Sequence, residues 1–173
     1  MDNRQFQSVF DAFEGDMTEY DFSVVGELTN LTKLKVCSLL KCKIIDESKN
    51  ASKTPYDSSP LMLVLGYNAK YLSYINLNHF SRKQLRVIMG RVMDYATSFN
   101  SQKSDLSSKL IIDLFASFGF SSKRIIRKAY LSTVRGVKHI TDDFECVKAI
   151  ALNDNSKDMF VFITREQYRR NLK

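Results

Sequence analysis

The chain has 173 residues, 44% of them apolar and 26% charged, and its formal net charge at pH 7 is +7, which indicates a single globular domain that needs no disulfide or metal to fold. No apolar run exceeds the five residues of Leu61–Leu65, whereas a membrane-spanning helix needs about 20. The first residues lack a signal-peptide pattern and the three cysteines form no even disulfide framework, so we expect free thiols in a reducing compartment.

The first segment, residues 1–31, is acidic. It holds seven acids and one base, a net charge of −6, while the remaining residues hold 25 bases and 12 acids, a net charge of +13. Phe6, Phe10 and Phe13 are spaced i, i+4, i+7, which predicts one aromatic face of a short helix, followed by an extended stretch. Because so short a helix cannot bury this face alone, we expect it to dock on the body of the protein or to bind a partner.

The next segment, residues 32–80, shows strand patterns. Residues 34–45 partly alternate apolar and basic side chains, which predicts a strand, and a polar loop follows. The apolar run at 61–65 predicts a central strand, and residues 66–70 form a turn into a second strand at 71–78. We therefore expect a β-hairpin after the loop.

From Ser81 the apolar period becomes helical. Ser81 and Gln84 form a capping box that opens a helix, and Gly119 is a left-handed cap that ends the next one. A third helix is expected from Ser121 or Ser122 to about Tyr130, and residues 131–140 either extend it or form a strand. The remaining expected elements are helices at 81–99, 104–118 and 141–152, a late strand at Met159–Ile163, and a short basic helix from Thr164.

The expected third helix divides into a basic and an apolar side. Its four cations fall within an arc of about 140° on a helical wheel; they are Lys123, Arg124, Arg127 and Lys128. Like charges four residues apart on a helix repel. Either this is a solvated helix face, or it meets a polyanion through phosphate contacts without base reading. The candidate nucleic-acid contacts are these four cations together with basic residues elsewhere in the chain. The full set is Arg82, Lys83, Arg86, Lys123, Arg124, Arg127, Lys128 and Arg135.

Other chemistry has little support in the sequence. Cys37 and Cys42 are five apart and would point to opposite faces of a strand, and neither histidine has metal-ligand spacing. No catalytic residue, metal site or cofactor is predicted. The tyrosines around the hairpin either stack bases or pack across the strands; they are Tyr67, Tyr71 and Tyr74.

One stretch resembles a known family. It comprises residues 35–40, the run Thr54-Pro55-Tyr56-Asp57-Ser58-Ser59-Pro60-Leu61-Met62-Leu63-Val64-Leu65, the strand end Ile75-Asn76-Leu77-Asn78-His79-Phe80, and the basic Arg124–Tyr130 segment. In this order the stretch resembles small virion proteins of large tailed bacteriophages, a family of DNA end protectors and uncharacterised virion proteins, over about residues 35–140. It departs from the family pattern at Tyr74, where the family has glycine, and at His79, which comes one place later.

The resemblance implies an α+β fold: a small SH3-like β-barrel or an antiparallel sheet with an appended helical subdomain. Tyr56, Asp57, Pro60 and Asn76 would then define the fold rather than catalyse a reaction. The expected organisation is an acidic arm at 1–31, a β-rich segment at 32–80 and a basic helical segment at 81–173 on the same core.

The resemblance and the basic body together predict a non-enzymatic virion protein of the phage head, neck or tail. We expect it to contact packaged DNA or other virion proteins, within a symmetric assembly, after a stage in the host cytoplasm. Two alternatives stay open: a purely structural adaptor of a baseplate or connector, and a phage regulator that binds a host protein. No membrane partner is expected.

Overall fold

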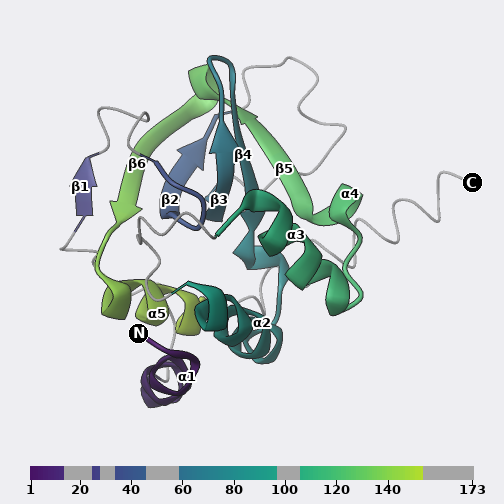
Figure 1. Ribbon diagram of the computed structural model, residues 1–173. Coiled ribbons are helices and arrows are strands. Elements are labelled where there is room, and N and C mark those ends of the chain that lie inside the picture. Colours follow the sequence, from purple (N-terminus) through teal and green to yellow (C-terminus); the bar gives the residue numbers. More distant parts are fainter. Residues whose placement is uncertain (14–24, 28–33, 46–58, 97–105, 154–173) are drawn as a thin grey trace, which may run out of the picture.

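The computed structural model describes residues 1–13, 25–27, 34–45, 59–96 and 106–153 (Figure 1). These residues form an α+β structure, in agreement with the predicted class. The helices are α1 (Asn3–Ala12), α2 (Arg82–Tyr95), α3 (Ser108–Ser117), α4 (Ser122–Ile125) and α5 (Asp143–Ala151), with 3₁₀ turns η4 (Leu77–His79) and η5 (Leu131–Thr133). The strands are β1 (Val25–Glu27), β2 (Leu39–Ile44), β3 (Leu61–Tyr67), β4 (Tyr71–Asn76), β5 (Ile126–Tyr130) and β6 (Val134–Ile140).

All strand pairs of the sheet are antiparallel, in the order β1-β6-β2-β3-β4-β5. The hairpin of β3 and β4 lies where the sequence predicts it, with a bulge between Val64 and Gly66. Strands β5 and β6 follow one another in the chain but lie on opposite sides of the β2–β3–β4 group.

The turn η5 makes that connection across the end of the sheet. The Leu131 N–H donates to the Lys70 carbonyl at 2.9 Å, and the Ile45 N–H donates to the Thr133 carbonyl at 2.9 Å. The connection is therefore held both to the β3–β4 turn and to the end of β2. In Figure 1 it closes the upper end of the sheet.

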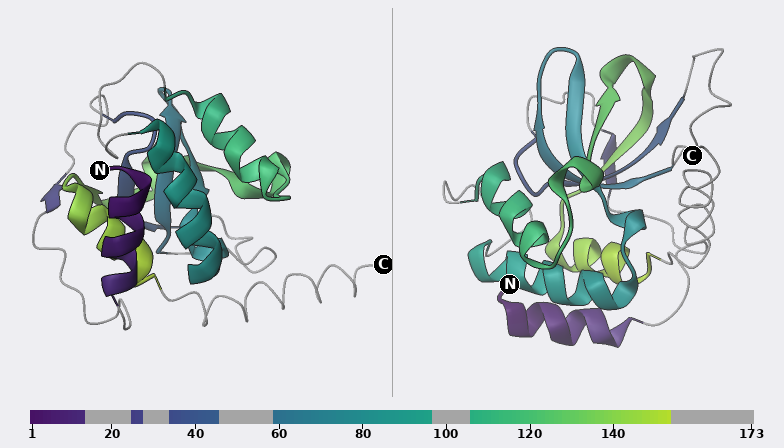
Figure 2. Two further views of the ribbon diagram at one scale, coloured as in Figure 1. Left: turned by 60° about the horizontal axis from the view of Figure 1, so that its bottom comes forward. Right: turned by 90° about the vertical axis from the view of Figure 1, so that its right-hand side faces the viewer.

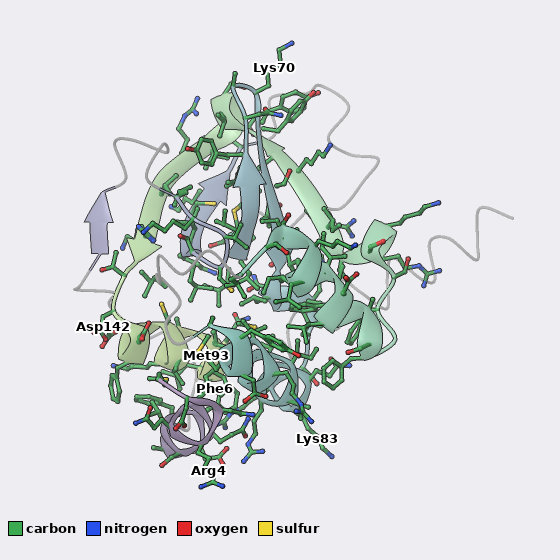
Figure 3. All side chains as sticks on the ribbon, viewed as in Figure 1. Arg4, Phe6, Lys70, Lys83, Met93 and Asp142 are labelled. Carbon is green, nitrogen blue, oxygen red and sulfur yellow. The ribbon has the colours of Figure 1, made fainter. Side chains whose placement is uncertain are left out.

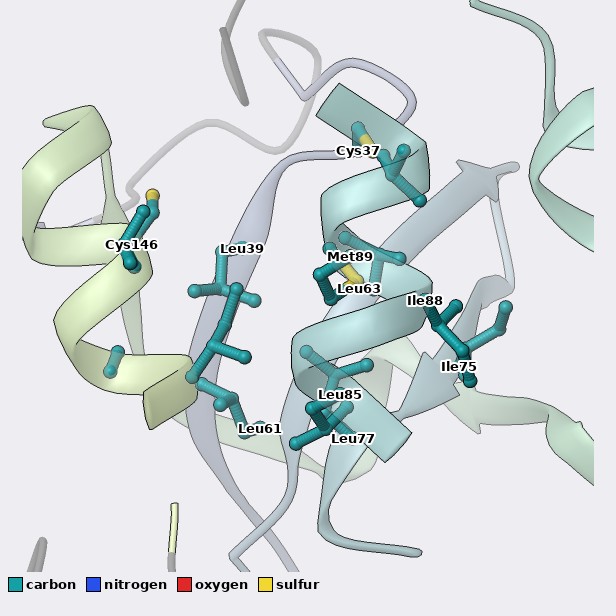
Figure 4. Close-up of a cluster of buried hydrophobic side chains, with 14 of the residues drawn as sticks. Cys37, Leu39, Leu61, Leu63, Ile75, Leu77, Leu85, Ile88, Met89 and Cys146 are labelled. Atoms are coloured by element: carbon teal, nitrogen blue, oxygen red, sulfur yellow. The ribbon is translucent and has the colours of Figure 1, made fainter. Parts of the chain in front are cut away.

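The sheet has an apolar core on each face. On one face Leu61 and Leu63 pack with helical side chains such as Met89, and Figure 4 shows this cluster between the strands, α2 and α5. On the other face Met62 and Val64 pack within a second cluster made by the strands themselves and adjoining residues. This two-sided burial explains why the 61–65 run is continuously apolar.

The helices form a layer on one face of the sheet. Both views of Figure 2 show α1 against α2 and α5, on the side away from the strands. Helix α2 begins with the predicted capping box of Ser81 and Gln84, and α1 has one of its own at Asp2. Gly119 has φ +86°, which confirms the predicted left-handed cap. Helix α5 lies within the predicted range.

The predicted third helix is wrong after Ile125. Helix α4 has only four residues, and the chain then extends as β5 along β4, pairing Ile126 with Ile75 and Tyr130 with Tyr71. Pairing with β4 overrides the helical period of this stretch. Residues 134–140 form β6, one of the two predicted alternatives.

Smaller differences concern strand ends. Strand β2 begins at Leu39 because Val36 and Cys37 form a turn, with Cys37 at φ +73°, and Leu77 and Asn78 belong to η4 rather than to a strand. Strands β5 and β6 come from the segment expected to be helical, and they complete the sheet begun by residues 32–80. Phe99, the polar loop at 46–58, the extended stretch at 14–24, the late strand at 159–163 and the C-terminal helix lie outside the described residues.

Candidate nucleic-acid interface

Charge separates the described residues into two halves. The sheet half, residues 25–27, 34–45, 59–80 and 121–140, holds ten cations and one acid, Glu27 of β1. The helical half, residues 1–13, 81–96, 106–120 and 141–153, holds seven cations and seven acids. The cations of the sheet half are Lys35, Lys41, Lys43, Lys70, Lys123, Arg124, Arg127, Lys128, Arg135 and Lys138. Figure 3 shows Lys70 at the tip of the sheet, far from Arg4, Lys83 and Asp142 in the helical half.

Two of the predicted contact residues on α2 instead hold α1. The Arg82 guanidinium donates to the carbonyls of Phe10 (3.1 Å) and Phe13 and lies over the Phe10 ring, 5.2 Å from its centroid. Arg86 makes a bidentate pair with Asp11, with Nε–Oδ1 at 2.6 Å and Nη2–Oδ2 at 2.5 Å. Arg82 is thus a cation at the C-terminal end of α1, where it complements the negative end of the helix dipole.

The pair of Arg86 and Asp11 also shifts the pKa values of both side chains. The hydrogen bond from Arg86, with its positive charge, lowers the pKa of the Asp11 carboxyl. The same pair raises the pKa of Arg86, which stays charged in any case. The acidic arm thus docks on the body through residues 1–13. Lys83, between the two arginines in sequence, is exposed.

The four cations of the expected third helix lie on two elements. Lys123 and Arg124 are exposed on α4. Arg127 and Lys128 are neighbours on β5 and therefore point to opposite faces of the sheet. Arg127 is opposite Tyr74 and half-buried, whereas Lys128 is opposite Ser73 and exposed. The single basic helix face does not exist, but three of its four cations are on the surface.

Strands β2 and β6 carry a second group of cations, mostly missed by the sequence prediction. Lys41 is directly opposite Lys138, and Lys43 is directly opposite Arg135. Like charges at directly opposite positions destabilise a sheet. The only predicted contact residue among the four is Arg135. The alternation of lysines with apolar residues at 40–44 was the sequence signal for a basic strand face.

Hydrogen bonds to backbone carbonyls stabilise two of these four cations. Lys41 Nζ donates to the Ser59 carbonyl at 2.5 Å, and Arg135 Nη1 donates to the carbonyls of Ser132 (2.5 Å) and Val134 (3.0 Å). Lys43 and Lys138 have exposed side chains. Glu27 of β1 is opposite Lys138 in register, on the other side of β6. The β2–β6 pair therefore presents the exposed ammonium groups of Lys43 and Lys138 beside two cations, Lys41 and Arg135, that donate to backbone carbonyls.

Two tyrosines and a lysine share one face of β4 and β5. Tyr71 is directly opposite Tyr130, their ring centroids are 4.7 Å apart, and their hydroxyls are 3.4 Å apart. Lys128 Nζ lies 5.9 Å from the centroid of the Tyr71 ring. The hydrogen bond with Tyr130 raises the pKa of Tyr71, with the nearby phenol adding to the effect.

The other tyrosines singled out in the sequence have different places. Tyr74 is buried in the strand-side core, as cross-strand packing predicts, and Tyr67 is exposed at the end of β3. Tyr130 is the partner of Tyr71 that sequence reasoning missed, because it was assigned to a helix.

The aromatic residues of α1 lie mostly in the core. Phe6 and Phe10 are buried with the side chains that α2 and the sheet contribute, and Phe13 packs against this cluster from its edge. The sequence left open whether this helix docks on the body of the protein or binds a partner, and in the structure α1 docks on the body. Phe6 and Phe10 do not present a surface to a partner.

The cysteines and histidines are not grouped as ligands for a metal ion. Cys37 lies in the helix-side core and Cys42 in the strand-side core. Burial raises the pKa of Cys37 to about 12, and burial followed by the charge of Asp143 raises the pKa of Cys146. Burial lowers the pKa of His139. Within the described ranges, no group of three or more His, Cys, Asp or Glu residues is placed to hold a metal ion.

None of the helices in the described part of the chain combines the length and the apolar character needed to cross a bilayer. Comparison of the chain with protein-family models, with curated proteins and with solved structures found no match. Functional inference for this chain therefore depends on its own geometry and charge.

Proposed function

We propose that this chain is a non-enzymatic virion protein of a tailed bacteriophage, of the head, neck or tail, that binds nucleic acid through its sheet half. The observation that carries the binding is the separation of charge: ten cations and one acid in the sheet half, against balance in the helical half. Such a predominantly positive field attracts polyanions. The virion location rests on the resemblance of residues 35–140 to virion proteins.

The binding is electrostatic and contacts phosphates. The paired cations of β2 and β6 repel one another across the ladder, and a phosphate between them would relieve that repulsion. Neutralising phosphates releases counterions, so affinity falls as salt rises. Phosphate contacts carry no sequence information, and we therefore expect little base preference in a duplex.

The strand arrangement supports an SH3-like barrel as the finer form of the fold. A sheet of five strands in which the fifth pairs with the first, and a 3₁₀ turn joins the fourth to the fifth, is the SH3-like order. Strands β2, β3, β4, β5 and β6, with η5 before β6, follow that order. The strand-side core would be the barrel interior, and α2 to α4 would be an insertion between the third and fourth strands.

The binding test compares two matched triple variants by fluorescence anisotropy on labelled DNA, duplex and single-stranded, at several salt concentrations. The sheet variant replaces Lys43, Arg124 and Lys138 with Gln, and the control replaces Arg4, Lys83 and Lys109 with Gln. Both remove three exposed charges, one arginine and two lysines. We expect the sheet variant to lose at least tenfold in affinity and to show a shallower salt dependence, and the control to lose little.

Two results would contradict this proposal. Wild-type protein that binds neither form of DNA at low salt would remove the nucleic-acid function and leave a purely structural adaptor or a regulator of a host protein. Equal losses in the two variants would show that only net charge matters. The virion location has its own test, since mass spectrometry of purified particles either finds the chain or does not.

A further inference from the structure

The pair of Tyr71 and Tyr130 lies on the surface of the sheet half. Tyr130 is 56% exposed, although its ring contacts Tyr71. Cross-strand packing explains the contact between the rings, but it leaves more than half of Tyr130 in water. The two hydroxyls are 3.4 Å apart, long for a hydrogen bond between hydroxyl groups. An exposed aromatic surface is therefore present on the edge strand β5.

Cations flank this aromatic surface. Lys128 is two residues before Tyr130 and so on the same face, with its Nζ 5.9 Å from the Tyr71 ring centroid. Lys70 precedes Tyr71 in the β3–β4 turn and is exposed, and its carbonyl holds Leu131, the residue after Tyr130. The turn thus brings a second ammonium group to the same end of the strands, and the one described carboxylate of the sheet half, Glu27, lies on β1 at the other end of the strand order.

A lysine on an edge strand also discourages pairing with other sheets, and β5 is at the end of the strand order. That role explains Lys128 alone. It does not explain the exposed Tyr130 ring that lies beside the lysine on the half-buried Tyr71, because exposed aromatic residues favour association rather than prevent it. The combination fits a ligand with both flat rings and negative charge.

We propose that Tyr71, Tyr130, Lys128 and Lys70 form a binding site for single-stranded nucleic acid, an inference that rests on the proposed function. A base stacks on the exposed Tyr130 ring, and the adjoining phosphates contact the two lysines. Every base has an aromatic face, so the site tolerates any sequence. In a duplex the bases are stacked on one another and cannot reach the ring, so the tyrosines act on single strands only.

The test measures binding of a labelled oligothymidylate, a mixed-sequence duplex and inorganic polyphosphate by wild-type protein and three variants. Tyr130→Ala removes the ring, Tyr130→Phe keeps the ring without the hydroxyl, and Tyr95→Ala removes a tyrosine of similar exposure (52%) in the helical half. We expect Tyr130→Ala to weaken single-strand binding roughly five- to hundredfold. We expect its duplex and polyphosphate binding to stay within twofold, and Tyr130→Phe and Tyr95→Ala to resemble wild type.

A second variant serves if Tyr130→Ala does not fold, as judged by its thermal melt. Lys128→Gln then reduces the slope of log affinity against log salt by roughly 0.7 on the single strand, if one phosphate contact is lost. An unchanged slope would overturn the site.

The remaining outcomes separate this inference from the proposed function. If wild-type protein binds duplex and polyphosphate but Tyr130→Ala weakens no ligand, or weakens all three equally, the stacking site is wrong and the proposed function stands. Binding of none of the three overturns both. Polyglutamate is measured as a fourth ligand, and tighter binding to it than to the oligonucleotide would assign the surface to an acidic protein and would also overturn the inference.

Discussion

The helical half and the sheet half use their charged residues differently. In the helical half, Arg86 pairs with Asp11, and Arg91 pairs with Asp94 at 3.5 Å. In the sheet half the ten described cations have one described carboxylate, Glu27 of β1, and four of the cations oppose one another across β2 and β6. Charge in the first region holds elements of the fold together, whereas in the second region like charges face one another across a strand pair, an arrangement that costs stability in a sheet.

The largest expected effect comes from removing the apolar contact that joins α1 to the rest of the helical half. Phe10 is 1% exposed, and Phe10→Ala leaves a cavity that should lower the free energy of unfolding by about 3–5 kcal/mol. Chemical denaturation measures this loss, with the exposed neighbour Ser8→Ala as the control. Unchanged stability would mean that α1 is detached in solution and that its aromatic face is available to a partner after all.

A second test compares the contributions of two adjacent cations of α2, Arg82 and Lys83, to stability. Arg82→Met removes the hydrogen bonds to the carbonyls at the end of α1 and should cost about 1–3 kcal/mol. Lys83→Met removes the same charge from an exposed position and should change stability little. The expected result is a lower urea midpoint for the first variant only. Equal midpoints would show that Arg82 does not hold α1, and would return it to the group of candidate nucleic-acid contacts.

Local signals explain which elements the sequence could predict. The capping box at Ser81, the stripe of α2 and the alternation around the β3–β4 turn all act within a few residues, and each element formed, although α2 ends at Tyr95 and β4 at Asn76, before the predicted ends. The failure at residues 126–130 has the opposite cause. The stretch has a helical period, but its partner strand β4 is about 50 residues earlier, and pairing with it decides the conformation.

The candidate site depends even more on distant contacts. Lys43 and Arg135 are 92 residues apart, and only the β2–β6 pairing brings them together. Likewise Arg86 and Asp11 are separated by 75 residues, so the sequence did not show that this arginine is engaged within the chain. Charge composition therefore predicted a basic body, but the basic surface lies on the sheet half, because strand pairing decides where the cations gather.

A third prediction separates stability from binding on the basic ladder. Lys43→Glu replaces one of two opposed cations, so the sheet should gain about 0.2–1 kcal/mol while affinity for DNA falls. Lys35→Glu is the control, since Lys35 is exposed in the turn before β2 and the charge change is the same. Thermal melts should rise for Lys43→Glu and not for the control. A fall in the melting temperature would mean that Arg135, which bonds to carbonyls, does not repel Lys43.

The smallest expected effect concerns the ion pair of the helical half. The pKa of Asp11 is lowered in the folded state, so its pairing with Arg86 stabilises the protein above the ordinary carboxyl pKa, near 4. As the pH falls below that value, the unfolded chain binds the proton first, and the contribution disappears once the pH is below the lowered pKa.

Asp11→Asn should therefore melt slightly below wild type at pH 7, with the gap closing as the pH falls through this window. The gap stays small because both side chains are substantially exposed. Asp113→Asn, an exposed carboxylate of α3 in the same half, provides the control for the change in net charge. A gap that is equal at pH 7 and at pH 2.5 would mean that the pair does not contribute through its charge. The contrast between an ion-paired helical half and a predominantly basic sheet half would then lose its main example.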